Sequence, residues 1–312
     1  MIVNHWAPVF TQLYGHTFPE SYCAVDTEYT GGSEDKDIIF EIGHTLVEDR
    51  KITDQLGIVI DWTDHPIVPW WWVEKALRRL ELKMGRPHRV TKEVMQREGL
   101  KPEKAFSFYH EFFTSLKRRG IPFAAHHGYY ADERLINGNF RGFIHKTFRF
   151  GENGLFDTGA IEKATQCYES EDPELSKNRA RWLPRPDDTM ESYFRRVVSA
   201  PVKGVYWRLE LCLQKYGLDT RYALDLNGLH TVEADTMAVH LLMEQFRSML
   251  THTNGPETLD PPGLARILEM ELAKHAERGV RERQEAREYE EERPRVAATR
   301  GARVRRRGQR SL

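Results

Sequence analysis

Apolar and β-branched residues gather in three short runs near the start of the chain, at 21–27, 38–48 and 56–62. Charged or polar residues separate the runs, as in "EDRK" after the second one. Runs of this length, rich in Val, Ile, Tyr and Thr and bounded by polar turns, are typical of β-strands. Three such runs in succession predict an antiparallel meander.

The pattern changes to a helical period after residue 100. Four apolar side chains share one face of a helix expected at 104–117, namely Phe106, Tyr109, Phe113 and Leu116. Strand and helix patterns then alternate, with strands expected at 121–127 and 153–159 and helices at 132–140 and about 232–249. This alternation predicts an α/β domain in which helices pack on a sheet.

Two long segments interrupt the regular pattern. Residues 168–202 are polar and contain several prolines, which predicts a surface insertion, and the tryptophan-rich segment at about 63–86 is expected to be another. The stretch "NGPETLDPPG" is typical of a linker. We therefore expect a globular domain at 1–252, a linker at 253–262, a charged helix at 263–292 and a disordered arginine-rich tail at 293–312.

Composition adds expectations about partners and location. With 40% hydrophobic residues, the 312-residue chain can bury a sizeable core. Its formal net charge is only −1, yet the tail after Glu292 is dense in arginine, so we expect it to contact nucleic acid, with a purely solubilising tail as the alternative. No apolar run is long enough to span a membrane and no secretory signal is evident, which favours a cytoplasmic location.

Asp26 and Glu28 stand out because they lie inside the first expected strand. They are two positions apart, so both side chains project from the same face of the strand. No lysine or arginine occurs between Ser21 and Glu34 to compensate their charge. Carboxylate oxygens are the ligands that Mg²⁺ and Mn²⁺ prefer, so a bound divalent cation is the simplest compensation. Taken alone, such a pair is also common at solvated strand ends.

Two later positions carry further candidate groups. Asp132 opens a helix after an apolar strand, where capping of the helix N-terminus is the ordinary explanation. Asp235 lies about one turn inside an apolar helix that Thr231 is expected to cap, and His230 can fold back beside it. A structural histidine and an ion pair between Asp235 and an arginine are the alternatives.

Six segments, taken in order, carry a resemblance to a known family. They are "VDTEYTG", "IIFEIGHTLV", "HRVTKEVMQREG", "FAAHHGYYADERLI", "FDTGAIEKA" and "LQKYGLDTRYALDLNGLHTVEADTMAVHLL". Together they resemble the successive motifs of the DEDDh family of 3′-to-5′ exonucleases, over roughly residues 21 to 250. The resemblance implies a ribonuclease-H-like fold, with a central mixed five-stranded sheet flanked by helices. It also implies a catalytic set, which consists of Asp26, Glu28, Asp132, His230 and Asp235.

The resemblance further implies a reaction. Two Mg²⁺ or Mn²⁺ ions about 3.5 to 4 Å apart would promote hydrolysis at single-stranded DNA or RNA 3′ ends, releasing nucleoside 5′-monophosphates. Asp26, Glu28 and Asp235 would hold one ion. Asp26 would also contact the second ion, which Asp132 would hold directly or through water. His230, whose ordinary pKa is about 6.5, is the expected general base.

Substrate contacts are expected from the end of the first strand, the loop after it and one histidine: Thr27, Tyr29, Thr30, Gly31 and His127. The family pattern His-Asn-x-x-Phe-Asp is incomplete here, since Gly128 replaces the asparagine and Ala131 the phenylalanine. His44 is interpreted as a core residue and Asp157 as a helix cap. The alternatives to an exonuclease are a catalytically silent nucleic-acid-binding or scaffolding module and another metal-dependent phosphoesterase.

Overall fold

The computed structural model describes residues 18–251, apart from 86, 153, 177–178, 186, 203–204, 206, 223 and 225–230. All of these residues lie in the first of the two units into which the chain divides, Met1–Thr258. The expected linker, charged helix and arginine-rich tail start at residue 253 and therefore lie outside the described residues.

Five strands form one sheet in the order β3-β2-β1-β4-β5. The strands are β1 (Tyr22–Tyr29), β2 (Ile39–Glu48), β3 (Lys51–Val59), β4 (Phe123–Ala125) and β5 (Leu155–Asp157). The first three pair antiparallel, which confirms the predicted meander, and β4 and β5 run parallel to β1. The predicted α/β fold with a central mixed five-stranded sheet is therefore confirmed.

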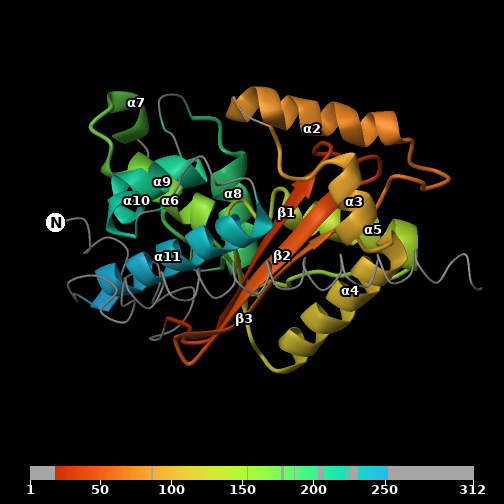
Figure 1. The fold of residues 1–312 in the computed structure, drawn as a ribbon. Coiled ribbons are helices and arrows are strands. Elements are labelled where there is room, and N and C mark those ends of the chain that lie inside the picture. The colour runs from red at the N-terminus through yellow and green to blue at the C-terminus, as the bar shows by residue number, and fades with distance from the viewer. Residues whose placement is uncertain are drawn as a thin grey trace, which may run out of the picture. The chain divides into compact units, whose positions relative to one another are not determined.

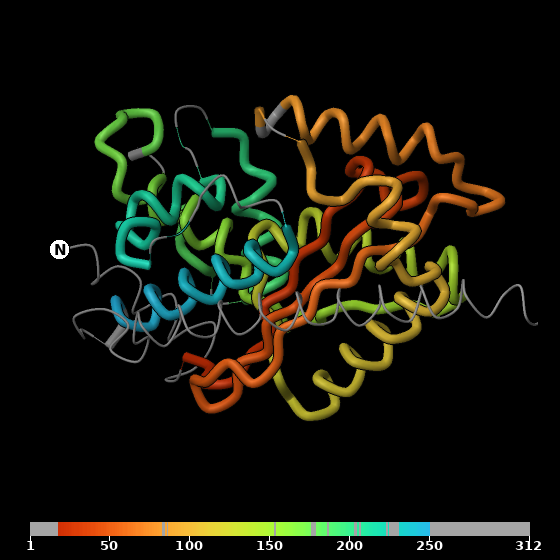
Figure 2. The backbone as a smooth tube through the Cα atoms, viewed as in Figure 1, coloured from red at the N-terminus to blue at the C-terminus, as the bar shows by residue number. Residues whose placement is uncertain are grey.

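Helices cover both faces of this sheet (Figure 1). Helix α11 (Val232–Thr251) packs against β1 and β2 on one face, so the last described part of the chain returns to the first, as the tube in Figure 2 shows. Helix α4 (Pro102–Arg118) covers the other face, where Tyr109 forms a hydrogen bond with His44 of β2. The helices are α2 (Trp70–Met84), α3 (Lys92–Glu98), α4 (Pro102–Arg118), α5 (Asp132–Ile144), α6 (Thr158–Glu169), α7 (Pro173–Ser176), η2 (Arg179–Trp182), α8 (Met190–Ser199), α9 (Leu209–Lys215), α10 (Leu218–Arg221) and α11 (Val232–Thr251). Among the described residues, no helix combines the length and the apolar character needed to cross a membrane.

Strand β2 lies between β1 and β3, and every residue in it except Glu48 is buried. Burial on both faces explains its long apolar run. The buried polar residue His44 bonds Tyr109 at 3.4 Å and Asp54 at 3.2 Å, which confirms its interpretation as a core residue. Burial lowers its pKa, so its imidazole is neutral near pH 7.

The third strand begins well before the expected residue 56, at Lys51. Asp49 and Arg50 both have positive φ angles, 49° and 66°, and turn the chain back at once. Strand β3 lies at the edge of the sheet, and three of its first four residues, Lys51, Thr53 and Asp54, are polar and exposed. A hydrophobic pattern cannot mark the start of such a strand.

The segment 168–202 differs from the polar surface insertion that we expected. Its second half forms α8, on which Tyr193 and Phe194 are fully buried. Thr189 and Ser192 close a capping box at the start of this helix. The prolines and charges before Thr189 dominate the composition of the segment and conceal this short amphipathic helix.

Candidate metal centre

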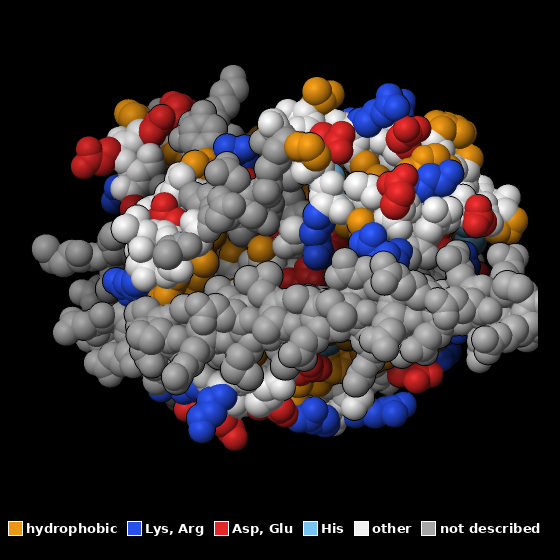
Figure 3. Space-filling view, in the orientation of Figure 1, with side chains coloured by type: hydrophobic (Ala, Val, Ile, Leu, Met, Phe, Trp, Pro, Cys, Tyr) orange, Lys and Arg blue, Asp and Glu red, His pale blue; other side chains and the backbone are white. Residues whose placement is uncertain are grey.

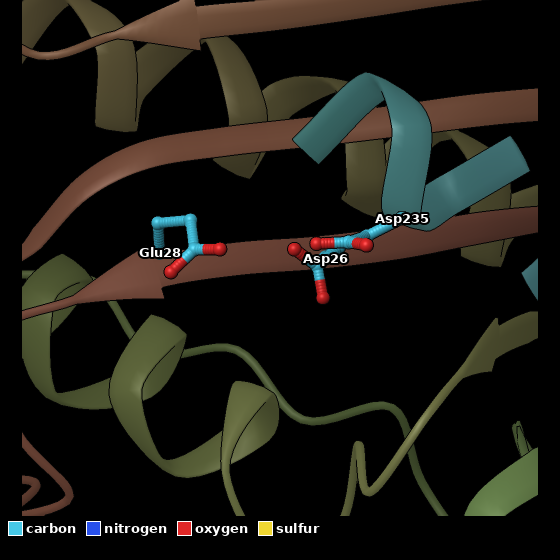
Figure 4. A group of neighbouring side chains, drawn as sticks. All are labelled: Asp26, Glu28 and Asp235. Atoms are coloured by element: carbon cyan, nitrogen blue, oxygen red, sulfur yellow. The ribbon is translucent and has the colours of Figure 1, made fainter. Parts of the chain in front are cut away.

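Three carboxylates from two distant parts of the sequence meet at one place (Figure 4). Asp26 and Glu28 lie on β1, and Asp235 lies in the first turn of α11. One carboxylate oxygen from each residue lies within 4.8 Å of the others. Glu28 and Asp235 are only 9% and 6% exposed. The structure therefore brings together three of the four acidic residues that the sequence singled out as metal ligands.

Negative charge is concentrated in this group. Burial raises the pKa of Asp26 well above its ordinary value, and the nearby carboxylates of Asp235, Asp132 and Glu28 raise it further. Figure 3 shows acidic side chains recessed near the middle of the visible face, beside Lys and Arg side chains. Carboxylates this close oppose one another's ionisation unless a cation lies among them. Three converging carboxylate oxygens fit a hard divalent cation such as Mg²⁺ or Mn²⁺.

Two glycines on neighbouring strands let α11 approach the sheet at this point. Gly43 pairs in register with Asp26 on one side and with Gly57 on the other, so the three positions share one face. A Cβ at position 43 would lie 2.5 Å from Val232 Cγ2, and one at position 57 would lie 2.2 Å from Glu233 Oε1. The first turn of α11 therefore occupies the space that both glycines leave.

The start of α11 is fixed by hydrogen bonds at both ends of its first turn. Thr231 caps the helix as predicted, since its Oγ1 accepts a bond from the Ala234 N–H at 3.3 Å. Its carbonyl oxygen accepts one from the Asp235 N–H at 2.9 Å. Thr236 Oγ1 accepts a bond from Thr45 Oγ1 on β2 at 2.9 Å. Asp235 thus lies between a capped helix start and a direct contact with the sheet.

Asp132 lies close to this group but is not one of the three converging carboxylates. It is the first residue of α5, and the capping position belongs to Ala131, so capping does not explain the aspartate. Its Oδ1 accepts a hydrogen bond from Thr27 Oγ1 at 2.6 Å. Burial raises the pKa of Asp132 to about 7, and the bond from Thr27 opposes that rise.

The loop after β1 is ordered by a residue that sequence reasoning missed, Asp37. Thr30 Oγ1 donates to Asp37 Oδ1 at 3.0 Å, and the Ser33 N–H donates to Asp37 Oδ2 at 2.8 Å. A Cβ at Gly31 would lie 2.8 Å from the same carboxylate. Gly31 therefore accommodates Asp37. Tyr29, at the start of this loop, has its pKa raised by burial and then by Asp132 and other acidic neighbours, so its phenol stays protonated.

His127 and Asp157 form a separate polar group beside the site. His127 has a positive φ of 68°, and its N–H donates to Asp157 Oδ1 at 3.0 Å. Asp157 also accepts a bond from the Ala160 N–H at 2.9 Å, which confirms it as the N-terminal cap of α6. Burial and the nearby Lys163 lower the pKa of His127 to about 4, so its ring is neutral.

The expected general base, His230, lies outside the part of the chain that the structure describes. Its proposed role therefore rests on the sequence motif. By contrast, the structure reveals two residues near the site that we did not single out, Glu41 and Arg89. Glu41 pairs with Glu28 across the β1–β2 ladder. A buried acid in the run "IIFEIGHTLV" was the available signal, but its partner could not be read from the sequence.

Comparisons with known proteins give a partial likeness. No protein-family model and no curated protein match this chain. Exonuclease I of E. coli in complex with a dA16 oligonucleotide is 13% identical, with a TM-score of 0.46 over 75% of this chain and 43% of that chain. Exonuclease I from Methylocaldum szegediense is 15% identical, with a TM-score of 0.46 over 74% of this chain and 42% of that chain.

A product-bound exonuclease I gives 12% identity and a TM-score of 0.48, over 75% of this chain and 45% of that one. The chain thus spans less than half the length of these three proteins. A likeness at this level carries no conclusion about activity. Membership of the DEDDh family accordingly stays a prediction from the sequence motifs.

Proposed function

We propose that this protein is a metal-dependent 3′-to-5′ exonuclease that acts on single-stranded DNA or RNA and releases nucleoside 5′-monophosphates. The observation that carries the proposal is the convergence of Asp26, Glu28 and Asp235, whose oxygens lie within 4.8 Å of one another. Carboxylates this close raise one another's pKa, as they do for Asp26, and a divalent cation among them would relieve that repulsion. The order of the sequence motifs supports the same reaction.

The four acidic residues of the site are the metal ligands in this proposal. Asp26, Glu28 and Asp235 would hold one Mg²⁺ or Mn²⁺, and Asp132 would hold a second ion directly or through water. Bound ions of this kind stabilise negative charge on a phosphodiester and lower the pKa of a water molecule. Thr27 would keep Asp132 oriented through its 2.6 Å hydrogen bond and favour the ionised carboxylate.

The substrate would lie along the end of β1 and the loop after it. Asp37 holds Thr30 and the segment around Gly31 in place, so the backbone there needs little reorganisation to meet a terminal nucleotide. His127, with its pKa lowered to about 4, would offer a neutral ring as a hydrogen-bond partner. His230 is proposed as the base that removes a proton from the attacking water.

The direct experiment uses 5′-labelled single-stranded DNA and RNA oligomers, incubated with the full chain and Mg²⁺. We expect a ladder of products shortened from the 3′ end, lost with a chelator and lost in Asp26→Ala. Asp54→Ala is the matched control, because Asp54 is a half-exposed acid on β3 whose partner is His44. This variant should keep the ladder.

The alternatives give different results in the same assay. Binding of the oligomers without any cleavage would indicate a silent nucleic-acid-binding module. Turnover of small nucleotides without a ladder would indicate another phosphoesterase. Either result would overturn the proposal, and comparison of the DNA and RNA ladders would reveal the sugar preference.

A further inference from the structure

We propose that Arg89 is a positioning residue for the metal centre. It bridges Glu41 on β2 and Glu233 on α11, and so fixes the first turn of this helix where Asp235 meets Asp26. The inference rests on the proposed metal centre, but it does not depend on which nucleic acid is the substrate.

Glu41 is a further acidic side chain on the face of the sheet that carries the centre. It pairs in register with Glu28, so two like charges lie directly opposite each other. Glu41 is fully buried, and its Oε2 has no hydrogen-bond partner within the described part of the chain. Its Oε1 accepts a hydrogen bond from Arg89 Nη2. The guanidinium of Arg89 therefore compensates a buried charge beside a proposed ligand.

The same guanidinium nitrogen also reaches α11. Arg89 Nη2 donates to Glu233 Oε2 at 2.6 Å. The carboxylate of Glu233 fills the space over Gly57, and its backbone carbonyl accepts a bond from Gln55 Nε2 at 3.0 Å. Glu233 is thus held through its side chain by Arg89 and through its backbone by β3.

The bridge affects the metal centre because it holds Glu233, which is close to Asp235 in the helix. Glu233 lies two residues before Asp235, within the same first turn of α11, so the two residues move together. Arg89 also pairs with the carboxylate of Glu41, which lies next to Glu28. Loss of the bridge should therefore displace Asp235 and leave the unpaired carboxylate of Glu41 beside Glu28. Arg89 itself is not a ligand.

The experiment measures the affinity of the full chain for Mn²⁺ by calorimetric titration without nucleic acid. Glu233→Ala removes the helix end of the bridge and keeps the pair between Glu41 and Arg89. The double variant E41Q/R89Q removes the fully buried charge of Glu41 together with its cation and releases Glu233 from the bridge, so that no fully buried carboxylate is left without its partner. We expect about 10- to 100-fold weaker Mn²⁺ binding in both, which is the usual effect of losing a residue that orients metal ligands.

Arg119→Gln is the matched control, because Arg119 pairs with Glu48, which lies on β2 like Glu41 but at the other end of the strand. It should leave the affinity for Mn²⁺ unchanged. Arg89→Lys keeps the charge, but its side chain is one atom shorter than the one that carries Nη2 to both carboxylates, so the affinity of this variant for Mn²⁺ should fall between those of the wild type and the double variant.

A purely structural bridge gives another result, which would overturn the inference. In that case Glu233→Ala and the double variant would unfold at lower temperature and yet bind Mn²⁺ like the wild type when titrated well below that temperature. A raised KM for oligonucleotides with unchanged Mn²⁺ affinity would likewise overturn it, by making Arg89 a substrate contact. If the wild type itself took up no Mn²⁺, the proposed function would fail first.

Discussion

Asp26 on β1 is paired in register with Gly43 on β2, and the place of a side chain at Gly43 is taken by Val232 of α11. The helix that carries Asp235 can therefore rest on the sheet beside Asp26. A position without a side chain is as necessary to this arrangement as the acids themselves. The pairing also explains why a two-residue pattern on one strand becomes a three-residue site in space.

Gly43→Ala tests this close approach. The added Cβ would lie 2.5 Å from Val232 Cγ2 and 2.7 Å from Val232 Cβ, so α11 must shift away from the sheet. We expect a loss of about 1 to 3 kcal/mol in the free energy of unfolding, as for other overpacked cores, and weaker Mn²⁺ binding. Gly142→Ala on α5 is the control, since nothing lies within 4 Å of the place that its added Cβ would take. Urea denaturation that ranked the two variants as equally stable would contradict the account.

The buried acids predict how stability without metal depends on pH. The pKa of Asp132 is about 7 in the folded protein, against an ordinary value of 3.8, so the unfolded chain releases this proton first. The free energy of unfolding should therefore fall as pH rises from about 4 to about 7. Between these two values, Asp132 should lower it by up to about 1.4 kcal/mol for each pH unit. The raised pKa of Asp26 acts in the same direction.

Asp132→Asn removes the titrating group, so the pH dependence of its stability can be compared with that of the wild type. In the presence of a chelator, the variant should be more stable than the wild type at about pH 8 and similar to it at about pH 4. Added Mg²⁺ should stabilise the wild type more at the higher pH. Urea denaturation curves that show the same pH dependence for both proteins would remove Asp132 as the cause.

Thr27→Val tests the hydrogen bond that holds Asp132. The hydroxyl of Thr27 lowers the pKa of this carboxyl, so its loss should raise that pKa further. The pH at which nuclease activity reaches half its maximum should then shift upward. Thr27→Ser keeps the hydroxyl and should keep the wild-type profile. A coincident shift in both variants would point to packing of the threonine methyl group instead.

Asp157→Ala separates a helix cap from a metal ligand. Its carboxylate accepts bonds from three backbone N–H groups, those of His127, Tyr129 and Ala160. Loss of an ordinary cap lowers the free energy of unfolding by about 0.5 to 2 kcal/mol. We expect a larger decrease here, because the substitution leaves buried N–H donors unpaired. Thr189→Ala, at the half-buried cap of α8, should lower the free energy of unfolding by only that ordinary amount. Calorimetry should find Mn²⁺ affinity unchanged in Asp157→Ala, and a marked drop would make Asp157 a ligand.

The sequence predicted those features that depend on local pattern. Alternation of side chains along a strand predicted that Asp26 and Glu28 share one face, and Thr231 was the signal for the start of α11. The bridge through Arg89 could not be predicted, because it needs the register that sets Glu41 opposite Glu28. Such pairing is decided by packing between strands and not by the sequence around either residue.

The same limit applies to the two glycines at positions 43 and 57. In the sequence each is a weak point within a strand, and only their pairing shows that both make room for α11. Strand β3 and helix α8 differ from expectation for a related reason. An exposed edge strand and a short helix behind a proline-rich stretch leave little hydrophobic signal.

Above all, we propose that Asp26, Glu28 and Asp235 together bind a divalent cation. The most direct measurement is a calorimetric Mn²⁺ titration of the full chain beside Asp26→Asn, Glu28→Gln and Asp235→Asn, which keep the shape of each side chain. We expect the wild type to bind Mn²⁺ and each variant to lose at least about 10-fold in affinity. Absence of uptake by the wild type, or equal affinity in all four proteins, would contradict this proposal.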